Sequence, residues 1–141
     1  MNEVDLRAIV EGVRARLDSA DLSGAHECFR SFPRGACGAT CDVLATILER
    51  RFGVEPQWVS ADIGDSEEWC SHAWLEVEGF TIDITADQFG KEPVIVTKHS
   101  GWHQSLPIIQ RVHYPMPQRN WGEVGRTVWD LVSDLAVPVS A

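Results

Sequence analysis

The sequence predicts an α+β fold in which helices pack against an antiparallel sheet. Apolar residues recur at helical spacing in two segments of the N-terminal third. Several short alternating segments follow them, and two of these are separated by a two-residue turn signal. One more helix-spaced segment closes the chain. The order helix, helix, strands, helix is typical of α+β proteins rather than of alternating α/β folds.

Size and composition predict a single globular domain over residues 1–141. The chain is 44% hydrophobic and 23% charged, so it has enough apolar surface for one core. Its net charge of −9 argues against a nucleic-acid partner and against an anionic membrane surface. Charges are spread through the first twenty residues, so we expect neither a signal peptide nor a membrane span, and a cytoplasmic location.

The first predicted helix covers residues 4–17. Its apolar residues fall near one face and are Val4, Ile9, Val10, Val13 and Leu17. Arg14 lies mostly off that face. The stretch 25–36 contains serine, proline and glycine, so it is predicted to be an irregular lead-in to the next helix.

The second predicted helix begins near Cys37 and runs to Arg51, with Gly53 as its C-terminal stop. Asp42 is placed off the buried stripe. The stripe itself has the spacing i, i+4, i+7, i+8, i+11, i+15 and consists of Cys37, Cys41, Leu44, Ala45, Leu48 and Phe52. This pattern buries one side of the helix and puts Cys37 at its N-terminal end.

Strands are predicted over 57–63, 71–77 and 80–85, with a hairpin turn at Glu78-Gly79. A two-residue turn pairs Val77 with Phe80, and this register sets Trp74 opposite Asp83 and His72 opposite Thr85. Opposed residues share a face of the sheet. The side chains of these last two pairs, Trp74 with Asp83 and His72 with Thr85, therefore point the same way.

The remaining segments are two short strands and a helix. The strands are predicted over 94–98 and 108–112, and the closing helix over 121–135. Between the two strands, His99, Trp102 and His103 cluster around Ser100-Gly101, which indicates a solvated surface turn.

Cys37 is the strongest candidate for a chemically reactive side chain. A helix N-terminus offers free N–H groups and the positive end of the helix dipole, and both stabilise a thiolate. Gly35 and Gly38 leave room beside it for a substrate carbonyl. The alternative is an inert thiol buried in the core stripe.

His72 and Asp83 supply the rest of a catalytic set. On the predicted hairpin Asp83 is a diagonal neighbour of His72, roughly 7–8 Å away between Cα atoms, so its carboxylate can hydrogen-bond the imidazole. An acid so placed orients the ring and stabilises its cation. Asp87, in the loop beyond the strand, is the competing acid.

This order of residues resembles the transglutaminase-like branch of the papain-like cysteine enzymes. The matching segments are FPRGACGATCDVLATILERRFG (32–53), SHAWLEVEG (71–79) and FTIDITADQF (80–89), under half of the chain. The resemblance implies a papain-like core. It also implies Cys37 as nucleophile, His72 as general acid and base, and Asp83 as the orienting acid. The family's side-chain oxyanion donor has no counterpart before Cys37, and Gln88 is a substitute; Gly38 and Trp74 are further candidates to line the substrate.

The predicted function is a thiol-dependent hydrolase, of protease, isopeptidase or deamidase type, that cleaves an amide through a Cys37 thioester. One alternative is a non-catalytic binding or immunity-type module with the same fold. Another is an acyltransferase or transglutaminase. No cofactor is expected: the spacing of His26, Cys28, Cys37, Cys41, Cys70 and His72 does not match a zinc site.

The substrate class follows from charge. Residues 61–92 contain nine acidic side chains and one basic one, Lys91. If the site opens on this segment, a cationic or amine-bearing peptide, protein or small amide is favoured. The alternative is a solvated acidic face.

Overall fold

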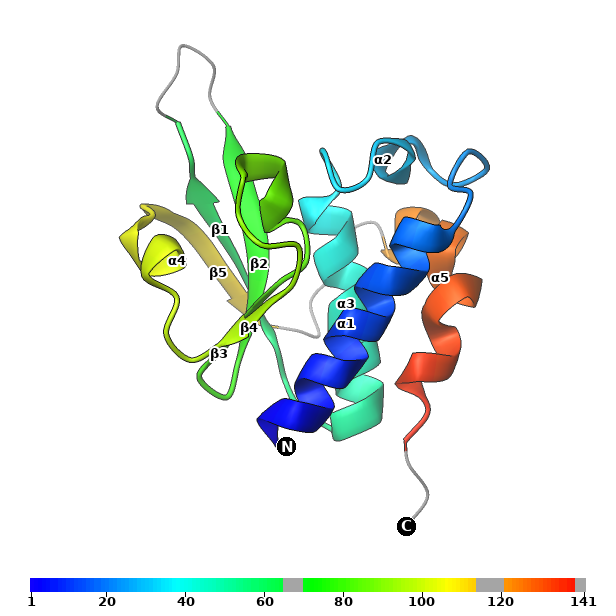
Figure 1. The fold of residues 1–141 in the computed structure, drawn as a ribbon, viewed down its shortest axis with the longest axis horizontal. Coiled ribbons are helices and arrows are strands. Elements are labelled where there is room, and N and C mark those ends of the chain that lie inside the picture. Colours follow the sequence, from blue (N-terminus) through cyan, green and yellow to red (C-terminus); the bar gives the residue numbers. More distant parts are fainter. Residues whose placement is uncertain (65–69, 114–120, 139–141) are drawn as a thin grey trace.

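The computed structural model describes residues 1–64, 70–113 and 121–138. It has the α+β architecture that the sequence predicts (Figure 1). The helices are α1 (Glu3–Ser19), α2 (Glu27–Arg30), α3 (Cys37–Phe52), α4 (Gly101–Ser105) and α5 (Arg126–Val132). The strands are β1 (Gln57–Asp62), β2 (Ser71–Val77), β3 (Phe80–Asp83), β4 (Ile95–Thr97) and β5 (Ile108–His113). Short 3₁₀ or π turns are η1 (Ala86–Phe89), η2 (Trp121–Gly125) and η3 (Ser133–Ala136).

The five strands form one antiparallel sheet in the order β4-β3-β2-β1-β5. Val77 pairs with Phe80, so the predicted register of the hairpin is confirmed. Glu78 and Gly79 both have positive φ, 49° and 85°, as the two central residues of a type I′ turn require. This turn places His72, Trp74 and Asp83 on one face of the sheet.

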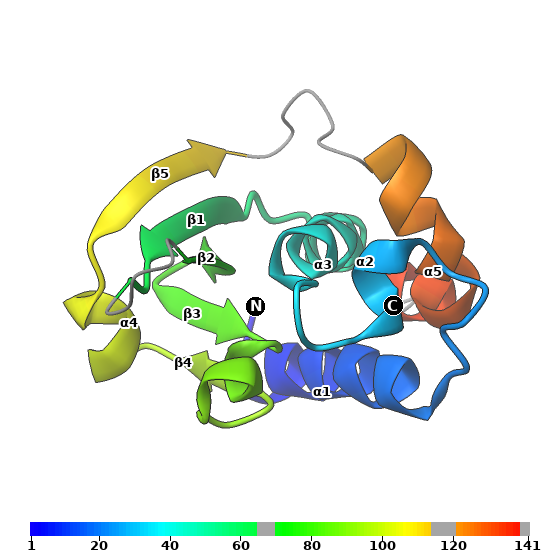
Figure 2. The same cartoon turned by 90° about the horizontal axis from the view of Figure 1, so that it is seen from above.

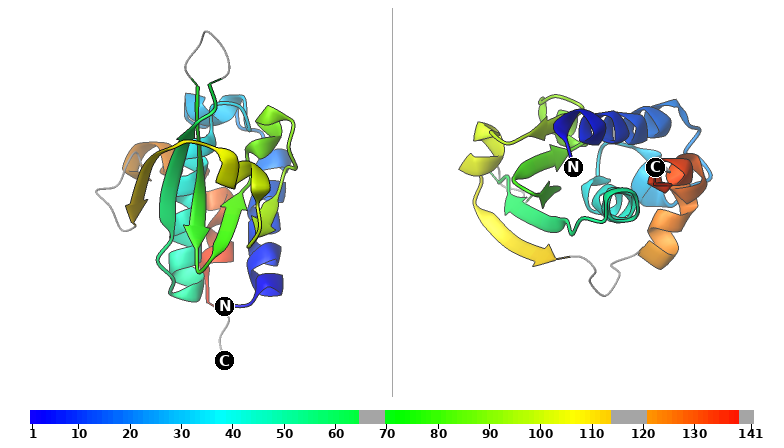
Figure 3. Two further views of the ribbon diagram at one scale, coloured as in Figure 1. Left: turned by 90° about the vertical axis from the view of Figure 1, so that its left-hand side faces the viewer. Right: turned by 90° about the horizontal axis from the view of Figure 1, so that it is seen from below.

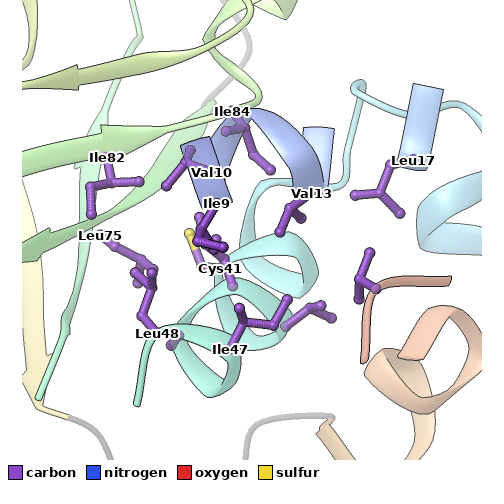
Figure 4. Close-up of a cluster of buried hydrophobic side chains, with 14 of the residues drawn as sticks. Ile9, Val10, Val13, Leu17, Cys41, Ile47, Leu48, Leu75, Ile82 and Ile84 are labelled. Carbon is purple, nitrogen blue, oxygen red and sulfur yellow. The ribbon is translucent and has the colours of Figure 1, made fainter. Parts of the chain in front are cut away.

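The main core lies on the other face. Ala73, Leu75 and Val77 of β2 alternate with the site residues and pack against α1 and α3. Figure 4 shows the side chains of both helices and of β2 and β3 meeting in this core. Seen from above, α1, α3 and α5 lie beyond one face of the curved sheet, and α4 lies on the other (Figure 2). The view from below in the right panel of Figure 3 shows the same layers.

Helix α1 is two residues longer at its C-terminal end than predicted and is capped at its start by the Asn2 side chain. Four of the five predicted core positions are buried, but Val4, in the first turn of the helix, is 77% exposed. Arg14, placed off the buried face by its charge, is buried instead. It meets acceptors from other elements, which periodicity does not reveal.

Helix α3 begins at Cys37 and ends where Gly53 adopts the left-handed conformation (φ 68°), as predicted. It is buried on more than one side because it lies between the sheet and the other helices. Val43 and Ile47 are therefore fully buried as well. Asp42, predicted off the stripe, is buried for the same reason.

Three local predictions were wrong in detail. The lead-in 25–36 contains a single helical turn, α2. The closing helix covers the predicted segment but changes type along it: η2, α5 and η3 follow one another without a gap over Trp121–Ala136. The segment around His103 is not a solvated turn, because α4 forms there and buries Ser100 and His103.

Within the described residues, no helix is both long and apolar enough to cross a membrane.

Candidate functional site

Cys37 is the first residue of α3 and is only partly buried. No side chain caps this helix end, so its N–H groups are available near the thiol. A Cβ atom added at Gly38, the residue after Cys37, would meet nothing within 4 Å, which leaves open space beside the first turn of α3. Gly35 has a φ of 69°, a conformation that glycine adopts without strain, in the turn that delivers the chain to Cys37.

His72 lies near the start of β2 and is fully buried. Its Nε2 atom lies 2.6 Å from Oδ2 of Asp83, the last residue of β3. The β2–β3 ladder covers Leu75 to Val77 only, so the first part of β2 is not paired with β3. The turn predicted that His72 and Asp83 are diagonal neighbours, and in the structure the two side chains form a hydrogen bond.

The remaining ring nitrogen of His72, Nδ1, is buried and completes no hydrogen bond with a described residue. The Cys37 thiol nevertheless interacts with this imidazole, and each shifts the other's pKa. Since Nε2 is engaged by Asp83, we infer that Nδ1 is the nitrogen left for the thiol. A loose pair of this kind is usual for catalytic groups in the absence of substrate.

The pKa shifts favour a thiolate–imidazolium pair. Burial opposes charge on Cys37, but hydrogen bonding and charge from His72, with backbone N–H groups of Ala73 and Gly38, outweigh it and lower the pKa of the thiol below 9.0. Burial likewise opposes charge on His72, but Asp83 and Cys37 outweigh it and raise its pKa to about 9. Asp83 has its pKa lowered to about 2, against the effect of burial, because His103 and His72 bond to it.

His103 is a member of the site that sequence reasoning missed. Its Nε2 lies 2.7 Å from the same Oδ2 atom of Asp83, and the side chain is 2% exposed. Ser100 caps α4 and contacts Nδ1 of His103. The sequence feature that could have indicated its role is the Ser-x-x-His spacing of Ser100 and His103. A serine in this position can cap a short helical turn, and that turn buries the histidine.

Asp87 does not contact His72. Its carboxylate forms two hydrogen bonds with Arg14, at 2.7 and 2.8 Å, while Arg14 also binds the carbonyl of Ile84. Asp83 is therefore the acid that meets the imidazole, and Asp87 anchors η1 to α1.

Gln88 lies in η1, and its Oε1 accepts a hydrogen bond from the backbone N–H of Gly35 at 3.5 Å. This contact joins η1 to the loop before Cys37. Its Nε2 is buried and has no hydrogen-bond partner within the described part of the chain. A side-chain N–H donor without a described partner thus lies in the element that contacts the loop before Cys37.

Trp74 is 1% exposed, and its ring lies 5.9 Å from that of His72. Its indole N–H binds Glu76, and it packs with Val59 and Ala61 in a second small core. Trp74 forms the packed floor beside the imidazole and is not open to a substrate in this conformation.

The other cysteines take no part in a metal cluster among the described residues. All four thiols are free, and the metal-capable group in that part of the chain is His72, Asp83 and His103. Burial, with nearby negative groups, raises the pKa of Cys41 well above 9.0, so it is an inert core thiol. The zinc set considered from the sequence is not assembled there.

Comparisons with protein-family models, with curated proteins and with solved structures gave no match for this chain.

Proposed function

We propose that the chain is a thiol-dependent hydrolase that cleaves an amide through a Cys37 thioester. The observation that carries the proposal is the connected set Cys37, His72 and Asp83. A thiol with a lowered pKa at a helix N-terminus faces a histidine whose other nitrogen binds a buried carboxylate. This is the arrangement that nucleophilic catalysis by cysteine needs.

The mechanism follows from the positions of the protons. The Cys37 thiolate attacks the carbonyl carbon, and the resulting oxyanion lies near the N–H groups at the start of α3. His72 then gives its Nδ1 proton to the leaving amine, and a thioester remains on Cys37. Water attacks the thioester as His72 takes a proton from it, and the acid product and free thiol are released. Asp83 holds the imidazole through Nε2 throughout.

Gln88 is proposed as the side-chain donor to the oxyanion. Its oxygen is engaged by Gly35, so its amide N–H groups are the ones free for another acceptor. The open space at Gly38 provides room for the carbonyl group. Trp74 is assigned to orientation of the imidazole through packing, because it is buried.

The transglutaminase-like, papain-like core is part of the proposal. It is supported by the order of the pieces: a cysteine opening a buried helix, a histidine on a following antiparallel strand and an aspartate on the next strand. A cationic or amine-bearing substrate and a cytoplasmic location stay expectations drawn from the acidic segment 61–92 and from the sequence.

Alkylation by iodoacetamide near neutral pH, mapped by peptide mass spectrometry, tests the proposal. Cys37 should react about tenfold or more faster than Cys28, Cys41 and Cys70, which serve as internal controls. The His72→Gln variant should remove this difference. Equal, slow labelling of all four thiols would favour the non-catalytic module instead.

The acyl group can be identified separately. Protein purified quickly from cell extract should carry an adduct on Cys37, absent from Cys37→Ser, and its mass names the acyl group. Transfer of that group to an added primary amine faster than to water would replace the hydrolase by an acyltransferase or transglutaminase.

A further inference from the structure

The carboxylate of Asp83 is shared between two imidazoles. Nε2 of His72 and Nε2 of His103 lie 2.6 and 2.7 Å from the same oxygen, Oδ2. The other oxygen, Oδ1, accepts from the backbone N–H and the hydroxyl of Thr85. A triad needs only the first of these partners, so the second histidine requires an explanation.

The hydrogen bonds around His103 fix where its proton lies. A carboxylate only accepts, so Nε2 of His103 must donate to Asp83. The hydroxyl oxygen of Ser100 accepts from the backbone N–H of His103, and the same hydroxyl is hydrogen-bonded to Nδ1. His103 is thus held as a donor by the cap of its own helix.

We propose that His103 is a positioning residue that controls, through Asp83, how firmly His72 holds its proton. The inference rests on the proposed function of Cys37 and His72. His103 does two things: it pins the carboxylate in place, and it takes part of the charge on Oδ2 that would otherwise attract the His72 N–H. With His103 present, His72 is charged enough to stabilise the thiolate but still able to release a proton to the leaving amine.

Two other roles for the cluster fit the distances less well. Tetrahedral zinc at about 2.1 Å from its ligands holds nitrogen and oxygen about 3.4 Å apart, whereas these pairs are at 2.6 and 2.7 Å. Ser100, His103 and Asp83 are also linked by hydrogen bonds in the way that the serine, histidine and aspartate of a serine triad are. However, the Ser100 hydroxyl is the cap of α4, and the residue is buried.

Other charged groups surround the cluster and are the same in every variant proposed below. Asp87 is paired with Arg14, and Glu76 with Arg111. Among the described residues, the titratable and charged groups on the neighbouring elements include Cys37, Cys41 and Asp42 of α3, Arg14 of α1, Asp87 of η1, Asp62 of β1, Glu76 of β2, Arg111 of β5, and Lys91, Lys98 and His99 before α4. A difference between the pH profiles of these variants therefore reports the loss of His103.

The experiment compares two substitutions of His103. His103→Gln keeps an N–H donor at about the reach of Nε2, and His103→Leu removes the donor at similar volume. The rate of Cys37 alkylation by iodoacetamide is measured from about pH 5 to about pH 10 in the wild type and both variants. Circular dichroism confirms that each variant is folded.

In the wild type, the alkylation profile should rise as Cys37 ionises and change again near pH 9 as His72 loses its proton. His103→Leu should move the upper transition to higher pH by about half a unit or more, because Asp83 then binds His72 alone. His103→Gln should return it toward the wild-type position. If His103→Leu does not fold, Ser100→Ala should shift the same transition in the same direction by less.

The outcomes separate the inference from the proposed function. A wild-type Cys37 that reacts as an ordinary thiol overturns the proposed function. A reactive wild type whose upper transition is unchanged in folded His103→Leu overturns only the role of His103. Stoichiometric zinc binding that His103→Leu abolishes, or labelling of Ser100 by a fluorophosphonate, also overturns it in favour of a metal site or a serine nucleophile.

Discussion

At the scale of single residues, Cys37, His72 and Asp83 are expected to act as one unit. Removal of the thiol or of the imidazole stops the same step, so their effects do not add. We expect Cys37→Ala and His72→Ala each to reduce hydrolysis of p-nitrophenyl acetate by about 10³-fold or more. The double variant should be no worse than either. Asp83→Asn should lose less, and Cys28→Ala is the control that should keep full activity.

Gln88 makes a second prediction at this scale. A donor to an oxyanion contributes about 10²–10³-fold to kcat, and Nε2 of Gln88 is a buried donor without a partner in the described structure. Gln88→Ala should therefore lower kcat by about 10²-fold with little change in KM. The exposed Gln104→Ala is the matched control. A change confined to KM would assign Gln88 to substrate binding instead.

At the scale of elements, the hairpin was predictable and α4 was not. Alternation and the Glu78-Gly79 turn are local features, and together they set the register that puts His72 beside Asp83. His103 reaches Asp83 across 20 positions of chain, from a five-residue helix too short for periodicity to detect. The Arg14–Asp87 pair spans 73 positions and was missed for the same reason.

Arg14 gives the prediction that belongs to this scale, because it ties α1 to η1. Its guanidinium binds Asp87 at two points, Asp18, and the carbonyls of Ile84 and Pro93. Arg14→Met would leave Asp87 and the buried Ile84 carbonyl unpaired, so we expect a loss of about 2–4 kcal/mol in urea unfolding.

The matched control for Arg14 is Arg16, two positions along the same helix. Its ion pair with Asp134 is exposed on both sides. Arg16→Met should therefore change stability far less than Arg14→Met. Equal effects from the two substitutions would mean that the buried network does not hold η1 in place.

At the scale of the whole molecule, the fold places the proposed nucleophile and its proposed base in different layers. Cys37 belongs to α3, in the helical layer, whereas His72 and Asp83 point from the opposite face of the sheet. Helix periodicity and strand alternation predicted each layer separately. Neither pattern contains the packing that brings one end of α3 to the start of β2, so before the structure only the family resemblance pointed to that contact.

This arrangement makes the stability of the whole protein depend on pH. The pKa of His72 is raised from 6.5 when unfolded to about 9 when folded. Its contribution is therefore fully present below pH 6.5 and is lost as the pH rises toward 9. Cys37 works in the opposite direction, because its pKa is lowered on folding. Cys37→Ser removes the opposing contribution of the thiol to the pH dependence of stability. It also removes the part of the rise in the His72 pKa that the thiol causes.

We therefore expect the free energy of unfolding of Cys37→Ser to fall by on the order of 1–2 kcal/mol over this alkaline range, measured by urea denaturation. The double variant Cys37→Ser, His72→Gln should lack this fall, because the titrating imidazole is absent. The wild type should show a smaller fall than Cys37→Ser, since the thiolate offsets part of it. If the double variant loses stability as steeply as Cys37→Ser, another group titrates, and the bond between His72 and Asp83 does not stabilise the fold.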